Sequence, residues 1–101
     1  MTDAVVELVT AMLAENDITV DDAISVIFTS TPDLTCAFPA AAARDLGFTD
    51  VPLLCASEIA VPGALPQVVR VLMHVETDVA RRDIQHVYLR GAEVLRQDLV
   101  P

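Results

Sequence analysis

The sequence predicts an α/β (equally, α+β) fold in which helices cover one face of a mixed β-sheet. Segments with helical spacing of apolar side chains alternate with short β-branched apolar runs of strand length. The predicted elements follow the order helix, strand, helix, strand, helix, strand. With 101 residues the chain has the size of one domain, and we assign residues 1–101 to it.

The first half of the chain is predicted to form two helices separated by a strand. Residues 23–29 (AISVIFT) are continuously apolar, which is typical of a strand covered on both faces. Residues 31–38 form a loop, after which Pro39 begins a second helix that ends at Gly47. The first helix spans residues 3–15, and its apolar stripe consists of Val5, Leu8, Val9, Met12 and Leu13.

The second half of the chain is predicted to contain two more strands and a longer helix. Residues 51–55 (VPLLC) form a strand, and a loop with a Pro-Gly turn follows over 56–65. A strand is predicted over 86–90 (HVYLR), and the tail 92–101 fits a helical turn or a strand equally. The helix is predicted over 66–77, with the apolar positions Leu65, Val68, Val69, Leu72 and Val75 on one side.

The charge of the chain argues against several classes of partner. It carries 15 acids against 6 bases, a net charge of −9, whereas nucleic acids and anionic membranes are bound by basic surfaces. No apolar run approaches the roughly 18 residues of a membrane span, and the acidic start (Asp3, Glu7) does not fit a leader peptide. We therefore expect a cytoplasmic protein that binds neither nucleic acid nor membrane.

The composition also indicates self-association and a special use of arginine. The mean hydropathy of +0.51 favours a homo-oligomer that buries apolar surface between copies. The chain has no lysine, and the arginine fork binds carboxylates and phosphates in a bidentate way. Ion pairs with the chain's own acids explain the same composition without a ligand. Five of the six arginines lie in the last third of the chain: Arg70, Arg81, Arg82, Arg90 and Arg96.

Common cofactor and nucleophile motifs are missing from the sequence. Its three glycines form no dinucleotide fingerprint, phosphate loop or nucleophile elbow. His74 and His86 have no partner at metal-ligand spacing, so we expect no metal and no cofactor. Cys36 and Cys55 are expected to be reduced.

Polar side chains in apolar surroundings predict a pocket. Glu58 directly follows the second predicted strand, Arg70 lies among valines, and Tyr88 lies within the last predicted strand. Residues 30–40 lead from a buried strand into a helix, a place where α/β proteins build sites. These features predict a pocket with a carboxylate, arginines and an apolar wall. An ion-paired arginine, a solvated glutamate and a core tyrosine explain the same residues without one.

Eight short motifs then occur in one order and spacing over about residues 5–99. They are Thr31-Pro-Asp-Leu34, Phe38-Pro-Ala40 with Arg44, Val51-Pro52, Cys55 with Glu58, Arg70-Val71, Thr77-Asp78, His86-Val-Tyr-Leu89 and Leu95-Arg96. As a set they resemble the monofunctional chorismate mutase of the Bacillus type, the trimeric α/β kind. The resemblance implies an isomerase of aromatic amino-acid biosynthesis, a trimeric pseudo-barrel fold, and active sites between subunits of a homotrimer.

The implied reaction is the pericyclic rearrangement of chorismate to prephenate, which needs no nucleophile, metal or cofactor. By resemblance, Arg70 is the catalytic cation at the ether oxygen. Glu58 and the backbone of Cys55 hold the substrate hydroxyl, and Tyr88 meets a carboxylate. The remaining implied substrate-binding residues are Phe38 and Leu95 as walls and Arg44 and Arg96 at the rim.

The chain departs from this family at its start. Members begin with a strand that resembles Arg-Gly-Ala-Thr-Thr, whose arginine binds a substrate carboxylate, whereas this chain begins within a helix. We therefore expect a domain that is short at its N-terminus and weak in mutase activity. The alternative is a catalytically impaired or non-enzymatic trimeric ligand-binding protein on the same scaffold.

Overall fold

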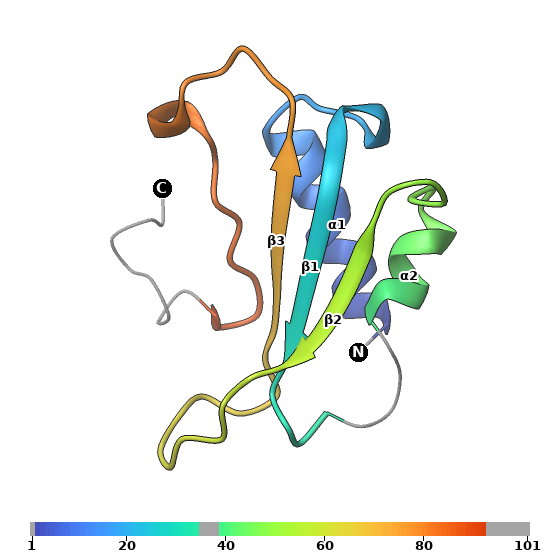
Figure 1. Ribbon diagram of the computed structural model, residues 1–101. Helices are drawn as coiled ribbons and strands as arrows, with labels where there is room; N and C mark the ends of the chain where they lie inside the picture. Colours follow the sequence, from blue (N-terminus) through green and yellow to red (C-terminus); the bar gives the residue numbers. More distant parts are fainter. Residues whose placement is uncertain (1, 35–38, 93–101) are drawn as a thin grey trace.

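The computed structural model describes residues 2–34 and 39–92. Within them, a sheet of three strands has the order β2-β1-β3 (Figure 1). The central strand β1 (Ala23–Ser30) pairs in parallel with β2 (Leu53–Ser57) and antiparallel with β3 (Val69–Val75). The sheet is therefore mixed, as the sequence predicts.

Both helices lie on one face of the sheet. The helix α1 (Thr2–Glu15) lies behind the strands in Figure 1, and α2 (Pro39–Asp45) lies to the right of β2. Val26 and Phe28 of β1 point into the core, where they are almost completely buried. The core between the sheet and the helices is completed by Val5, Val9, Ala40, Ala42, Ala43 and Phe48.

The other face of the sheet carries exposed apolar side chains, and no described helix covers it. We predicted β1 to be covered on both faces, and this is wrong for one copy of the chain. Leu54 of β2 and Leu72 of β3 are 60% and 56% exposed. Apolar side chains of this size on the uncovered face of a sheet are typical of an interface.

The prediction of a helix over residues 66–77 is wrong, because most of this segment forms β3. Val69, Val71 and Met73 pack against the core, while the side chains between them are exposed. The apolar positions used for the prediction fit a helical stripe, but the segment is also rich in β-branched valine, which suits a strand. All seven residues of β3 pair with β1, with one register irregularity between Ala23 and Ser25, and this pairing decides in favour of the strand.

The strand predicted over residues 86–90 is not part of the sheet. The chain leaves β3, forms the 3₁₀ turn η2 (Arg81–Asp83) and returns alongside β3 in the opposite direction (Figure 1). No ladder joins this returning segment to β3 among the described residues. The predicted tail 92–101 lies outside the described residues apart from Ala92. Of the helices within residues 2–34 and 39–92, none has the length and apolar character to cross a membrane.

Candidate functional site

An ion pair on the open face of the sheet forms the centre of the site. Arg70 and Thr29 are directly opposite each other in the β1–β3 register, and both lie near the same end of the sheet. Glu58 follows the last residue of β2 and reaches the same place. Its Oε2 atom lies 3.0 Å from Nε of Arg70 and accepts a hydrogen bond of 2.6 Å from the hydroxyl of Thr29.

The exposure of the two charged side chains differs. The Glu58 side chain is 18% exposed, whereas that of Arg70 is 54% exposed. The backbone N–H of Glu58 also donates a 2.9 Å hydrogen bond to the carbonyl oxygen of Ser30, which holds the residue at the end of the sheet. Glu58 is therefore a fixed anion, and its contact with Nε holds the Arg70 side chain.

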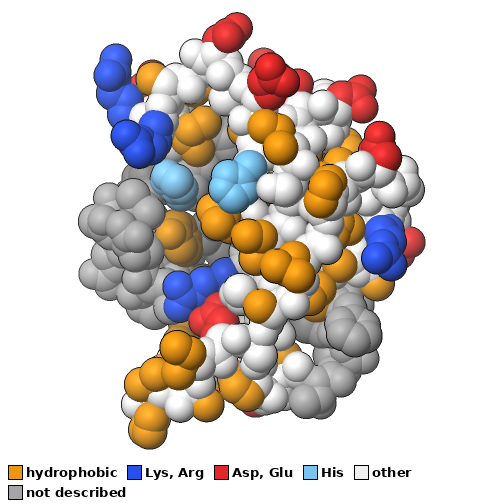
Figure 2. Space-filling model, viewed as in Figure 1, with side chains coloured by type: hydrophobic (Ala, Val, Ile, Leu, Met, Phe, Trp, Pro, Cys, Tyr) orange, Lys and Arg blue, Asp and Glu red, His pale blue; other side chains and the backbone are white. Residues whose placement is uncertain are grey.

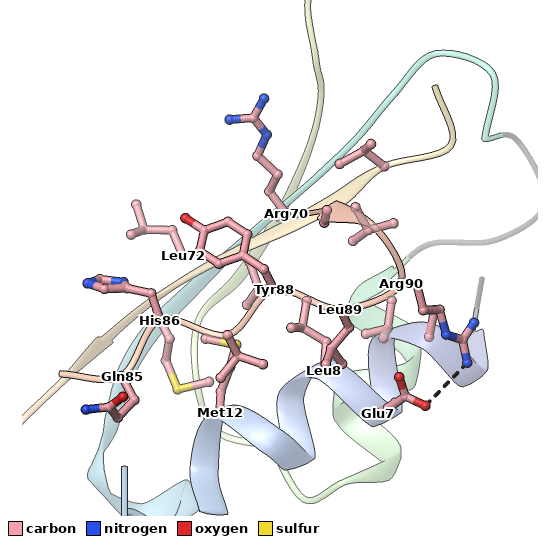
Figure 3. Close-up of a pocket in the computed structure, with 18 of the residues that line it drawn as sticks. Glu7, Leu8, Met12, Arg70, Leu72, Gln85, His86, Tyr88, Leu89 and Arg90 are labelled. Carbon is pink, nitrogen blue, oxygen red and sulfur yellow. Dashed lines mark hydrogen bonds and ion pairs between the residues drawn. The ribbon is translucent and has the colours of Figure 1, made fainter. Parts of the chain in front are cut away.

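The free end of Arg70 points away from the sheet. In Figure 3 its two terminal nitrogens project outward, above the groove beside β3. Among the described residues, the ion pair of Arg70 uses Nε alone. The two terminal nitrogens are consequently placed to bind an anionic or electron-rich oxygen from outside the chain.

Tyr88 faces the Arg70 side of the groove from the opposite bank (Figure 3). The groove separates β3 from the returning segment 84–90 and has a volume of about 820 Å³. Leu8 and Met12 of α1 form part of its floor. The structure thus brings Arg70, Glu58 and Tyr88 to one side of the molecule.

Arg44 and Cys55 lie in a second group at the opposite edge of the sheet. They line a shallow hollow of about 230 Å³ together with Ala40, Ala41 and Leu53. The Arg44 side chain lies in the last turn of α2, and Cys55 is a partly buried residue of the edge strand β2. This hollow presents a cation beside the backbone of a strand edge.

The two groups do not meet within one chain. Cys55 and Arg70 lie on strands that flank β1, so roughly 10 Å of sheet separates their backbones. Cys55 packs toward the helices, whereas Arg70 points to the open face. The other predicted site residues, Phe38, Leu95 and Arg96, lie outside the described residues.

Thr29 is a site residue that the sequence reasoning missed. Its hydroxyl holds the Glu58 carboxylate at 2.6 Å. The available signal was its place near the end of an otherwise apolar strand, where a polar side chain must face an open surface or a partner. That signal is weak, because threonine is common in strands.

The loop that follows β1 is held by a second polar cluster. The Thr31 hydroxyl accepts a 3.0 Å hydrogen bond from the backbone N–H of Val68, and Asp33 accepts one of 3.0 Å from the N–H of Gln67. A hydrogen bond from the Thr31 side chain, with further ones from backbone N–H groups, lowers the pKa of Asp33 below its ordinary value of 3.8. These contacts fix the entry to β3, and hence the position of Arg70.

The described residues contain no group of three or more His, Cys, Asp and Glu side chains that could hold a metal ion. His74 instead contacts a neighbouring hydroxyl, with 3.2 Å between its Nδ1 and Oγ of Ser25.

Comparison with known proteins identifies the family. The family model for chorismate mutase type I matches residues 1–99. The chain belongs to this family. It is 52% identical to the chorismate mutase AroH of Thermus thermophilus over 94 residues, which are 92% of this chain and 77% of that protein. It is 42% identical to the chorismate mutase AroH of Bacillus subtilis (strain 168), with 92% of this chain and 74% of that protein covered.

A solved structure supports the same assignment. The chain is similar to a chorismate mutase from Clostridium thermocellum, with a TM-score of 0.90 and 49% sequence identity. The likeness covers 92% of this chain and 83% of that one. The family, the mixed α/β fold and the isomerase activity that the resemblance implied are thereby confirmed.

Proposed function

We propose that the chain isomerises chorismate to prephenate with Arg70 as the cation at the ether oxygen. The observation that carries this assignment is the half-exposed Arg70 side chain, held through Nε by Glu58 with both terminal nitrogens directed outward. A reaction of this kind belongs to aromatic amino-acid biosynthesis, and we place it in the cytoplasm.

The reaction is unimolecular, so the site has two tasks. It must hold the flexible dicarboxylate substrate in a compact conformer, and it must stabilise the charge that develops on the ether oxygen as the bond breaks. The terminal nitrogens of Arg70 provide fixed donors for this charge. Because Glu58 already holds the guanidinium, little reorientation is required when the transition state forms.

The other residues of the site bind and enclose the substrate. The Glu58 carboxylate also accepts a hydrogen bond from the substrate hydroxyl. The Tyr88 hydroxyl donates a hydrogen bond to a carboxylate of the substrate. We propose the remaining contacts for the backbone of Cys55 and for Phe38, Arg44, Leu95 and Arg96. Their chemistry, two arginines and two apolar side chains, suits a dianion with an apolar ring.

We further propose that the complete site forms between neighbouring copies of a homotrimer. The Arg70 group and the Arg44 group lie at opposite edges of one sheet, so a second copy is needed to bring them together. The open sheet face and the loop after β2 supply apolar surface for this contact. The exposed large apolar side chains include Ile59 at 86% and Val61 at 57%, and Figure 2 shows orange side chains gathered at the lower left of the molecule.

A subunit-mixing experiment tests this arrangement. Arg70→Ala removes the first group and Arg44→Glu disables the second, so each variant alone should be nearly inactive. In a closed ring of three, every mixed trimer has one interface with both groups intact. Mixing the unfolded variants in equal amounts and refolding them should therefore restore about one quarter of the parental activity.

The control uses two variants of the same group. Arg70→Ala mixed with Glu58→Ala should remain inactive, because no interface then regains a complete set. A site built within one chain would give no recovery in either mixture, and sedimentation as a monomer with full activity would also contradict the proposal.

A further inference from the structure

We propose that Thr29 is a positioning residue for the isomerisation, whose hydroxyl fixes the Glu58 carboxylate and, through it, the guanidinium of Arg70. Thr29 belongs to the central strand β1 (Figure 1). The inference rests on the catalytic role proposed for Arg70. It adds a residue that acts on this cation through Glu58 and does not itself touch the substrate.

The first observation is that one carboxylate oxygen receives both donors. Oε2 of Glu58 lies 2.6 Å from the hydroxyl oxygen of Thr29 and 3.0 Å from Nε of Arg70. Thr29 and Arg70 are opposite each other on β1 and β3, whereas Glu58 follows the last residue of β2. The Glu58 side chain therefore reaches from the end of β2 across β1 to β3, and Thr29 holds it on the way.

The second observation is the difference in rigidity between the three side chains. The Arg70 side chain is 54% exposed, and an exposed ion pair does little to overcome the rotamer freedom of two long side chains. Threonine has one β-branched side-chain torsion with few rotamers, and Thr29 is paired with Ala56 on one side and with Arg70 on the other. Its hydroxyl is thus the fixed point of the group, and a hydrogen bond of this length to a carboxylate is a strong one.

The distribution of the contacts over the two Glu58 oxygens shows what the hydroxyl controls. Within residues 2–34 and 39–92, the side-chain contacts of this carboxylate fall on Oε2 alone. Oε1 is left to accept the hydrogen bond proposed above from the substrate hydroxyl. Without the Thr29 hydroxyl, the carboxylate would rotate more freely about its terminal torsion, and the guanidinium would move with it. Fewer chains would then hold the Arg70 donors in the position that the ether oxygen requires.

Replacement of Thr29 by valine and by serine separates the hydroxyl from the shape of the side chain. Thr29→Val keeps the branched shape and removes the donor, and we expect kcat to fall about tenfold through the loss of alignment. Thr29→Ser keeps the donor and should retain kcat within about twofold of the parent. In the Glu58→Ala chain, Thr29→Val should change kcat by less than about twofold, because the side chain through which it acts is gone.

Ser25→Ala is the matched control for these variants. It removes a hydroxyl from the same face of β1, four residues and about 13 Å away. The Ser25 hydroxyl contacts His74 and takes no part in the Glu58 group. Its removal should leave kcat unchanged, and a thermal melt of each variant shows that the compared chains are folded.

A measurement without substrate keeps this inference separate from the proposed function. Solvent exchange of the Nε–H proton of Arg70 can be followed by NMR on the isotope-labelled full chain, where Arg70→Lys identifies the signal by its loss. Because this N–H contacts Oε2, its exchange should be about tenfold faster in Thr29→Val than in the parent and in Thr29→Ser. A failure of the proposed function appears as full turnover in Arg70→Ala, whereas a failure of the positioning by Thr29 appears as unchanged exchange in Thr29→Val.

Three results would overturn the proposal. They are equal kcat and equal Nε–H exchange in the parent and Thr29→Val, the same loss of kcat in Thr29→Ser as in Thr29→Val, and a loss that persists in full in the Glu58→Ala chain. Thr29→Ala also removes the hydroxyl, and it provides the same three comparisons if the valine variant fails to fold.

Discussion

Replacement of Arg70 tests the catalytic proposal most directly. Arg70→Ala removes the two outward nitrogens together with the Nε that contacts Glu58 at 3.0 Å. Arg70→Lys keeps the positive charge but supplies a single nitrogen, which cannot both hold Glu58 and reach the substrate. We expect both variants to lose activity, with little recovery in the lysine variant.

The structure predicts a large loss of activity and a small loss of stability for Arg70→Ala. Removal of one preorganised donor to a transition-state oxygen lowers turnover by about 10²–10³, or roughly 3–4 kcal/mol. The Arg70 side chain is 54% exposed, and an ion pair with this exposure contributes at most about 1 kcal/mol to folding. Turnover of Arg70→Ala should thus fall far more than its stability.

The assay is the conversion of chorismate to prephenate, followed with a thermal melt of each variant. Arg82→Ala is the control, because Arg82 is exposed in the η2 turn away from the groove. A fall in kcat of less than tenfold for Arg70→Ala would refute its role at the ether oxygen. A loss of melting cooperativity would instead show that Arg70 is needed for the fold.

Three further predictions concern the polar contacts. Glu58→Gln, which removes the charge beside Arg70, should lower kcat/KM by roughly 10- to 100-fold, or about 1.5–3 kcal/mol, in the same assay. Because the pKa of Asp33 is lowered in the folded chain, its stabilising contribution is present above pH 3.8 and is lost as the pH falls through the lowered value. Asp33→Asn should remove this part of the acid sensitivity in melts between pH 2 and 5, roughly the range spanned by such carboxyl groups. Asn16→Ala, which removes two hydrogen bonds to Gln85, should speed amide exchange of residues 85–89 about tenfold with a small change in global stability.

Local sequence patterns predicted much of the scaffold. The apolar stripe of α1, the β-branched run of β1 and the proline at the start of α2 each specify one element, because the necessary information lies within a few residues. The motif set also led to the correct family. Glu58 and Arg70, predicted from it as the polar pair of the site, do contact each other.

For residues 66–77 the local sequence was not enough to predict the secondary structure. Its valines and leucines fit both a helical stripe and a strand, so the sequence left two solutions of similar quality. Pairing with β1 over the length of β3 selected the strand. This pairing is a long-range contact, and its energy depends on the neighbouring strand and not on the segment alone.

The dependence on long-range contacts also separates what the sequence by itself determined from what the tertiary structure decided. The sequence determined the residue types of the site and the alternation of residues 86–90, since these are properties of the chain. The tertiary structure decided that Thr29 joins Glu58 and Arg70, and that Arg44 lies at the opposite edge. It also placed residues 84–90 across a groove from β3. Each of these outcomes depends on which strands pair and which face the helices cover, because only packing brings distant residues together.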